Sequence, residues 1–124
     1  MGLQPGLRGE ARLVVNDDDT AIALGSGDVP VLGTPALLAL VEKAACAAIA
    51  DALDESDTSV GVWVDLEHVA ASKPGAEVTA EAELVGVEGK TVEFRCEARD
   101  GEKVVARVRH KRAVVNRERF LARA

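Results

Sequence analysis

Residues 34–53 read TPALLALVEKAACAAIADAL, and this stretch decides the fold of the chain. Thr34 is a residue type that caps helix N-termini, and Pro35 suits the first helical position, where no backbone N–H is needed. Ala, Leu, Val and Ile fill most of the later positions, which predicts a helix from Pro35 to Leu53. A helix that is apolar almost all round is typical of a buried element rather than one laid on a surface.

Strand-like segments lie on both sides of this helix. Before it, residues 9–15 predict a strand, residues 16–19 a turn, and residues 20–24 a short returning strand. After it, the predicted strands span residues 59–69, 77–87, 90–99 and 102–116. The first of these four is apolar on both faces as far as Asp65, which predicts a strand covered on both sides.

The connections between these strands are short, and Asp100-Gly101 is a strong hairpin signal. The chain therefore predicts one domain over residues 1–124, in which four antiparallel strands form a meander around one long buried helix. This is an α+β arrangement. Residues 117–124 are expected to form a short helix or a frayed tail. Because a single sheet leaves an edge unpaired, we expect a homodimer formed through edge strands.

Composition excludes several function classes. Only 2% of the residues are aromatic and the net charge is −6, which disfavours binding of nucleic acid. No apolar stretch is long enough to span a bilayer, and the N-terminus lacks a charged segment followed by an apolar run, so we expect a cytoplasmic protein without a membrane partner. Cys46 and Cys96 are expected to be buried free thiols, and no spacing predicts a metal site.

Three polar residues stand where their neighbours are apolar: Thr34, Glu42 and His68. A hydroxyl, a carboxyl and an imidazole are the groups needed to attack an activated acyl group. Glu42 has apolar helical neighbours, and partial desolvation favours the use of a carboxylate as a base. His68 ends an apolar strand and needs a hydrogen-bond partner there. The N-terminus of the helix adds a positive dipole near Thr34, where an oxyanion could be stabilised.

The order and spacing of these residues resemble a known family. The matching motifs are Gly33-Thr34, Glu42 within the helix, Ser59-Val60-Gly61, His68, Lys73-Pro74-Gly75, Val85 to Gly89, and His110-Lys111-Arg112-Ala113-Val114. Together they resemble the hotdog-fold acyl-CoA thioesterases of the fluoroacetyl-CoA thioesterase type, over nearly the whole chain.

The resemblance implies a hotdog fold, hydrolysis of a small acyl-CoA thioester, and no cofactor apart from the coenzyme A of the substrate. It implies that Thr34, Glu42 and His68 are catalytic and that the backbone N–H of Gly61 polarises the thioester carbonyl. Gly33 and Arg112 are expected to contact the substrate. The family's Phe lid, which selects fluoroacetate, corresponds to residues 25–31, and these contain no Phe. The acyl group therefore stays open.

Structural interpretations compete with these functional ones. Thr34 is expected to cap the helix, a role that chemistry does not exclude, and Glu42 could instead lie on a solvated helix face beside Lys43. His68 could be an ordinary strand-end histidine. His110 is expected to be structural or at the surface. The basic run from Arg107 to Arg112 is expected to be a solvated strand face, unless some of it meets coenzyme A phosphates.

Two other functions remain open from the sequence. The first is a hotdog module that binds an acyl-CoA or another hydrophobic ligand without turnover. Turnover against a panel of acyl-CoA thioesters separates this module from an enzyme, because binding alone only stabilises the fold. The second is a hydratase of the same fold, which is weaker because no Asp/His pair has the expected spacing in one segment.

Overall fold

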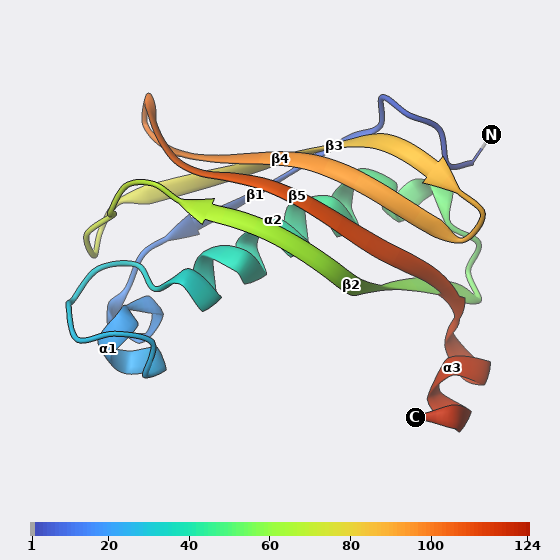
Figure 1. Ribbon diagram of the computed structural model, residues 1–124, viewed down its shortest axis with the longest axis horizontal. Coiled ribbons are helices and arrows are strands. Elements are labelled where there is room, and N and C mark those ends of the chain that lie inside the picture. The colour runs from blue at the N-terminus through green and yellow to red at the C-terminus, as the bar shows by residue number, and fades with distance from the viewer. Residues whose placement is uncertain (1) are drawn as a thin grey trace.

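The computed structural model describes residues 2–124 as an antiparallel five-stranded sheet with one long helix along one face (Figure 1). The strands are β1 (Arg8–Val14), β2 (Asp57–His68), β3 (Glu77–Glu88), β4 (Thr91–Asp100) and β5 (Lys103–Asn116). The helices are α1 (Ala21–Leu24), α2 (Thr34–Ile49) and α3 (Arg117–Arg123), with 3₁₀ turns at Asp17–Asp19 and Ala50–Ala52. The predicted α+β arrangement is confirmed.

The strand order in the sheet is β1-β3-β4-β5-β2, so the meander is shorter than predicted. Only β3, β4 and β5 follow one another as neighbours, whereas β2 lies at the far edge and pairs with β5. The prediction of a four-stranded meander was wrong because hydrophobic alternation identifies strands but does not say which strands pair. The β2–β5 register matters for function, since it places Gly61 opposite Arg112.

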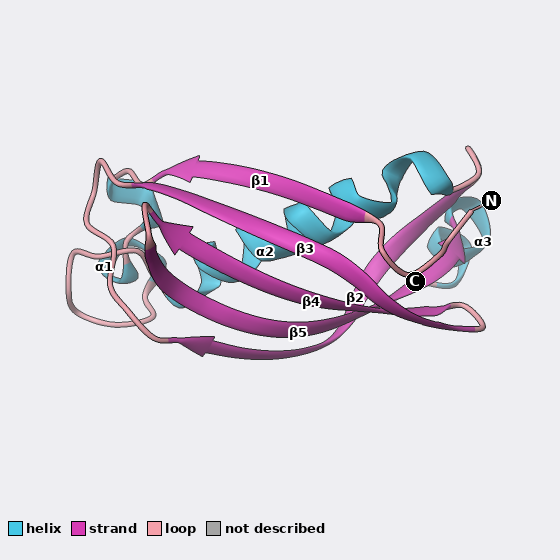
Figure 2. Cartoon of the chain, turned by 90° about the horizontal axis from the view of Figure 1, so that it is seen from above, coloured by secondary structure: helices cyan, strands magenta, loops and turns pink. Residues whose placement is uncertain are grey.

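The core lies between α2 and the sheet, and α2 packs mainly against β1 and β3 (Figure 2). Leu37, Val41 and Ile49 of α2 are fully buried there. At the closest approach, a Cβ on Gly9 would collide with the backbone of Ala48, so only glycine fits at this position in β1. This close packing fixes the position of α2 along the sheet.

One side of α2 stays exposed, which corrects the prediction of a helix buried all round. The exposed side carries small and polar residues, including Ala39, Lys43, Cys46 and Ala47. Cys46 is therefore an exposed thiol, whereas Cys96 is buried as predicted. The sheet covers a helix from one side only, and Ala and Cys are small enough to be tolerated on either side. The helix also ends at Ile49, and the predicted last turn is a 3₁₀ turn.

The edge strand β2 is not covered on both faces either. Val62, Trp63 and Val64 are exposed, at 56%, 42% and 39% of their surface. A β-bulge interrupts the β2–β5 pairing between Gly61 and Trp63. The chain thus presents an apolar segment at a free sheet edge, a feature that soluble proteins usually cover.

The structure also contains two short helices, α1 and α3. Residues 21–24 form the helical turn α1 rather than the predicted strand, because the Thr20 hydroxyl accepts a hydrogen bond from the Ala23 N–H and Gly25 ends the turn in a left-handed conformation. The C-terminal residues form α3, capped by the Asn116 side chain. No helix within residues 2–124 has the length and apolar character needed to cross a membrane.

Candidate active site

The first part of the site lies where α2 begins beside the end of β2. There the Thr34 Oγ1 and the His68 Nδ1 are 2.8 Å apart, a hydrogen-bonding distance. The structure gives the cap position of α2 to Gly33, which has no side chain, and makes Thr34 the first helical residue. The prediction of Thr34 as a capping residue was therefore wrong, and its hydroxyl holds the imidazole instead. We call these two residues the Thr34–His68 pair.

His68 is held as a neutral imidazole. Burial lowers the pKa of His68 below its ordinary value, and the polar backbone of nearby Ala70 offsets part of this effect. Its second ring nitrogen, Nε2, is buried and contacts no hydrogen-bonding atom within residues 2–124. A buried polar atom without a partner is unusual and is often found at functional sites. A neutral imidazole with one uncommitted nitrogen can take a proton from water and, once protonated, pass it to a leaving group.

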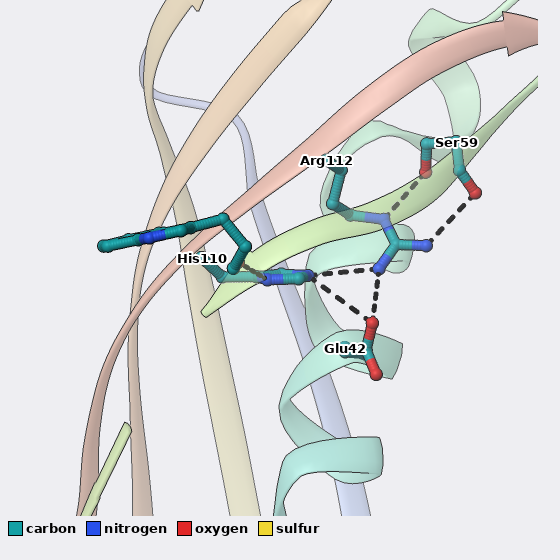
Figure 3. A network of polar contacts seen from close by, with 5 residues as sticks. Glu42, Ser59, His110 and Arg112 are labelled. Carbon is teal, nitrogen blue, oxygen red and sulfur yellow. Dashed lines mark hydrogen bonds and ion pairs between the residues drawn. The ribbon is translucent and has the colours of Figure 1, made fainter. Parts of the chain in front are cut away.

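The second part of the site is a polar network around Glu42, in the middle of α2 (Figure 3). The Arg112 Nη1 donates to the Glu42 Oε2 at 3.0 Å. On its other side, the guanidinium donates to the hydroxyl and the carbonyl of Ser59, at 2.9 and 3.1 Å. Arg112 is buried, whereas the Glu42 side chain remains 38% exposed. The arginine therefore holds the carboxylate in one orientation while one side of it stays open to a substrate.

His110 completes this network, and its protonation state follows from its partners. The His110 Nδ1 lies 2.8 Å from the carbonyl of Trp63, which can only accept, so Nδ1 carries the proton. The Nε2 therefore accepts from the Arg112 Nη1 at 3.1 Å. Burial lowers the pKa of His110, the nearby Arg112 cation lowers it further, and the Trp63 hydrogen bond and Glu42 oppose this effect. A neutral His110 and Glu42 thus share the two hydrogens of one arginine nitrogen.

Gly61 lies directly beneath the Glu42 carboxylate. A Cβ at this position would collide with the Glu42 Oε2 and would also lie 3.2 Å from the His110 ring and 3.3 Å from the Arg112 guanidinium. Only glycine leaves room for the carboxylate against the strand. The predicted site residues Glu42, Gly61 and Arg112 are therefore brought together. We call these residues, with Ser59 and His110, the Glu42 cluster.

The two parts of the site are separate within one chain. Thr34 and Glu42 are about two turns apart on α2, or roughly 12 Å along its axis. His68 and Gly61 are roughly 23 Å apart along β2. The imidazole beside Glu42 is accordingly that of His110, not that of His68 as the sequence suggested. A single chain does not assemble Thr34, Glu42 and His68 into one set.

The remaining basic residues near Arg112 point elsewhere. Because strand residues alternate between faces, Arg109 lies on the outer face of β5, where it pairs with Glu93 at 2.8 Å, and Lys111 lies over the Trp63 ring at 5.1 Å. A groove of about 920 Å³ also lies on this outer face and is lined mainly by Arg, Glu and Asp side chains. Within residues 2–124, no group of three or more His, Cys, Asp or Glu residues could hold a metal ion.

Comparisons with known proteins identify the family of the chain. A family model described as fluoroacetyl-CoA-specific thioesterase matches residues 15–118. The fluoroacetyl-CoA thioesterase of Streptantibioticus cattleyicolor is 37% identical over 93 residues, which cover 75% of this chain and 67% of that protein.

Solved structures give the same result. A variant of the fluoroacetyl-CoA thioesterase FlK in complex with acetyl-CoA has a TM-score of 0.91 and 31% identity, covering 98% of this chain and 96% of its own. A hot-dog-like protein from Thermanaerovibrio acidaminovorans has a TM-score of 0.87 and 25% identity, covering 98% of this chain and 90% of its own. The predicted hotdog fold is confirmed.

Proposed function

Because this chain belongs to the family of fluoroacetyl-CoA-specific thioesterases, we propose that Thr34, Glu42 and His68 are the residues with which it hydrolyses a small acyl-CoA thioester. Family membership confirms the resemblance seen in the sequence and makes the chain a thioester hydrolase. The products are a free acid and coenzyme A. The proposal concerns which residues carry out this hydrolysis and what each of them does. The observation that carries it is the Glu42 carboxylate lying against Gly61, where no side chain fits.

In the proposed reaction, the carbonyl of the thioester lies against the backbone of Gly61, whose N–H polarises it. Glu42 then either attacks the carbonyl to form an anhydride or takes a proton from an attacking water. In both versions the carbon–sulfur bond breaks and coenzyme A leaves as a thiolate, and a water opens the anhydride in the first version and the thioester in the second. The neutral His68 accepts the proton released by this water, directly or from Glu42, and passes it to the thiolate. The free acid, coenzyme A and the unchanged enzyme remain. Thr34 orients His68 through their hydrogen bond. Gly33 and Arg112 remain proposed substrate contacts, and Arg112 also holds Glu42.

We propose that two copies of the chain form each site, because one chain keeps its own Thr34–His68 pair away from its Glu42 cluster. In such a dimer a two-fold axis relates the two chains. The axis brings the Thr34–His68 pair of one chain to the Glu42 cluster of the other if it passes midway between these two parts of the site, both on α2 and on β2. The midpoint of Thr34 and Glu42 is Leu38 on α2, and that of Gly61 and His68 falls between Val64 and Asp65 on β2. The exposed apolar segment of β2 lies at this second midpoint, so the same axis would cover it.

A complementation experiment tests both the residues and the two-chain site. Glu42→Gln and His68→Ala are each expected to lower the rate of thiol release from acyl-CoA by about 10²-fold or more, because each removes a proton-transfer group. When the two variants are mixed, unfolded together and refolded, half of the dimers contain both. One of the two sites in each such dimer is then intact. We expect roughly a quarter of the wild-type rate to return.

The outcomes separate the competing functions. No recovery, with both variants inactive alone, would place all three residues in one chain and contradict the two-chain site. A wild-type chain that binds acyl-CoA but hydrolyses none of a broad panel would be the binding module. A cytoplasmic location belongs to the same proposal, since both cysteines are free and reduced thiols are typical of that compartment.

A further inference from the structure

A second cleft lies at the end of β2 opposite to His68. It has a volume of about 440 Å³ and lies between the start of β2, the end of β5 and α3, which projects from that end of the sheet (Figure 1). Three cations line it: Lys90, Arg119 and Arg123. Within residues 2–124 none of the three forms a salt bridge with a carboxylate. In a chain with a net charge of −6, three such cations around one cleft need an explanation.

The positions of these cations are fixed by the fold. Arg119 and Arg123 lie one turn apart on α3 and therefore share a face. The Asn116 side chain caps α3, and the Val114 N–H donates to the Lys90 carbonyl at 2.8 Å, which holds the β3–β4 turn against β5. Among the described residues that line the cleft, Asp57 has the one acidic side chain, against three cationic side chains, so the side chains make the cleft electropositive.

The cleft also contains an exposed aromatic ring. The chain has only two Phe and one Trp. Phe94 is buried in the core, whereas Phe120 lines the cleft and is 41% exposed. A flat ring beside two arginines is the combination that stacks with a base while its phosphates pair with guanidinium groups.

The cleft lies on the same face of β2 as the Glu42 cluster. Asp57, Ser59 and Gly61 alternate along a regular part of the strand, so they share a face. The distance from Gly61 to Asp57 along the strand is roughly 13 Å. The pantetheine arm of coenzyme A has about a dozen bonds between its sulfur and its first phosphate, which gives a reach of roughly 15 Å. A thioester at Gly61 therefore has an arm long enough for its phosphates to reach the cleft.

We propose that the cleft lined by Lys90, Arg119, Phe120 and Arg123 binds the nucleotide end of coenzyme A, with the cations on its phosphates and Phe120 against its adenine. This proposal rests on the proposed function, which requires acyl-CoA at the Glu42 cluster. It assigns the recognition of phosphate to the C-terminal helix and not to the basic strand segment Arg107 to Arg112. Arginine binds phosphate oxygens in a bidentate manner, which suits a pyrophosphate and a 3′-phosphate presented side by side.

The experiment compares two double variants with the wild-type chain. Arg119→Gln with Arg123→Gln removes two cations from the cleft, and the control, Arg95→Gln with Arg107→Gln, removes two from the outer face of the sheet. Calorimetric titration with coenzyme A is expected to show an affinity about 10-fold or more weaker in the cleft variant and unchanged in the control. The KM for acyl-CoA is expected to rise by the same factor at constant kcat. The kinetics with acyl-pantetheine, which lacks the nucleotide, should not change.

Each outcome decides a different point. Equal coenzyme A affinity in the wild type and the cleft variant would contradict the proposal that the cleft binds the nucleotide, whether or not acyl-CoA is hydrolysed. A second outcome is that the cleft variant binds coenzyme A more weakly while the wild-type chain hydrolyses no thioester. This outcome would support the cleft as the nucleotide site and contradict the proposed function. Lys90→Gln supplies an independent test, because Lys90 lies outside α3 and weaker binding in this variant cannot come from an unfolded helix.

Discussion

The Thr34–His68 pair and the Glu42 cluster lie on the same two elements, α2 and β2, but are built differently. The pair consists of one hydrogen bond at the end of both elements, with one imidazole nitrogen left without a partner. The cluster is a fully connected network in the middle of both elements, in which a buried Arg112 contacts three side chains. One part of the site is held rigidly, and the other is left free to exchange a proton.

This difference matches the roles of the two parts. A group that must keep a carboxylate in line with a carbonyl needs several fixed contacts, because catalytic geometry tolerates little displacement. A group that moves protons needs a free nitrogen and a pKa near the working pH. We therefore expect changes in the cluster to act through geometry and changes in the pair to act through proton transfer. The three predictions below test this contrast, beginning with the largest effect.

The largest effect is expected from Gly61→Ala. This change removes no polar group, but its Cβ would displace the Glu42 carboxylate. A displacement of about 1 Å at a reacting group costs on the order of 10²-fold in rate, so kcat for acyl-CoA should fall by that factor. The measurement is steady-state thiol release. Gly86→Ala is the matched control, since its Cβ would meet only the Glu93 Cβ at 3.9 Å, and it should keep the wild-type rate. Equal rates in both variants would show that Glu42 need not lie against Gly61.

The sequence predicted the helix and most strands because these follow from local patterns. Alternation marked β3 and β4, and Thr34 with Pro35 marked the start of α2 within one residue. The pairing of β2 with β5 was missed, because strand pairing is a tertiary property. The short helix α1 was missed because a cap at Thr20 and a left-handed Gly25 override a short apolar pattern.

The site was predicted in composition but not in arrangement. Glu42, Gly61 and Arg112 could be named from the sequence, yet their contact depends on the β2–β5 register that places Gly61 opposite Arg112. His110 was assigned to structure or surface, although its Nε2 contacts Arg112 beside Glu42. The available signal was its spacing of two residues from Arg112 on one strand, which puts both side chains on the same face. In the sequence this spacing does not stand out, because it lies within the basic run from Arg107 to Arg112. It becomes informative only when the bounds of β5 are known.

A smaller effect is expected from Thr34→Val, which keeps the shape of the side chain and removes the hydroxyl. His68 Nδ1 then has no partner, so the imidazole is less well oriented, and we expect kcat to fall about 10-fold while stability falls by about 1 kcal/mol. Thr34→Ser keeps the hydroxyl and is the matched control for both readouts. Steady-state kinetics and thermal unfolding give the two values. A Ser variant as slow as the Val variant would assign the role of Thr34 to its methyl group rather than to the hydrogen bond.

The smallest effect concerns the stability of the fold below neutral pH. Burial lowers the pKa of His110 beneath its ordinary value of 6.5, so the unfolded chain binds a proton in a range where the folded chain does not. Stability therefore falls as the pH falls below about 6.5, and a charged His110 would also face the Arg112 cation beside Glu42. Thermal unfolding between about pH 5 and pH 8 should show this loss in the wild type and a smaller loss in His110→Gln. His68→Gln should reduce the loss less, because His68 is only half-buried. An unchanged pH dependence in His110→Gln would mean that the cluster accommodates a charged imidazole, and that its rigidity does not depend on the neutral form of His110.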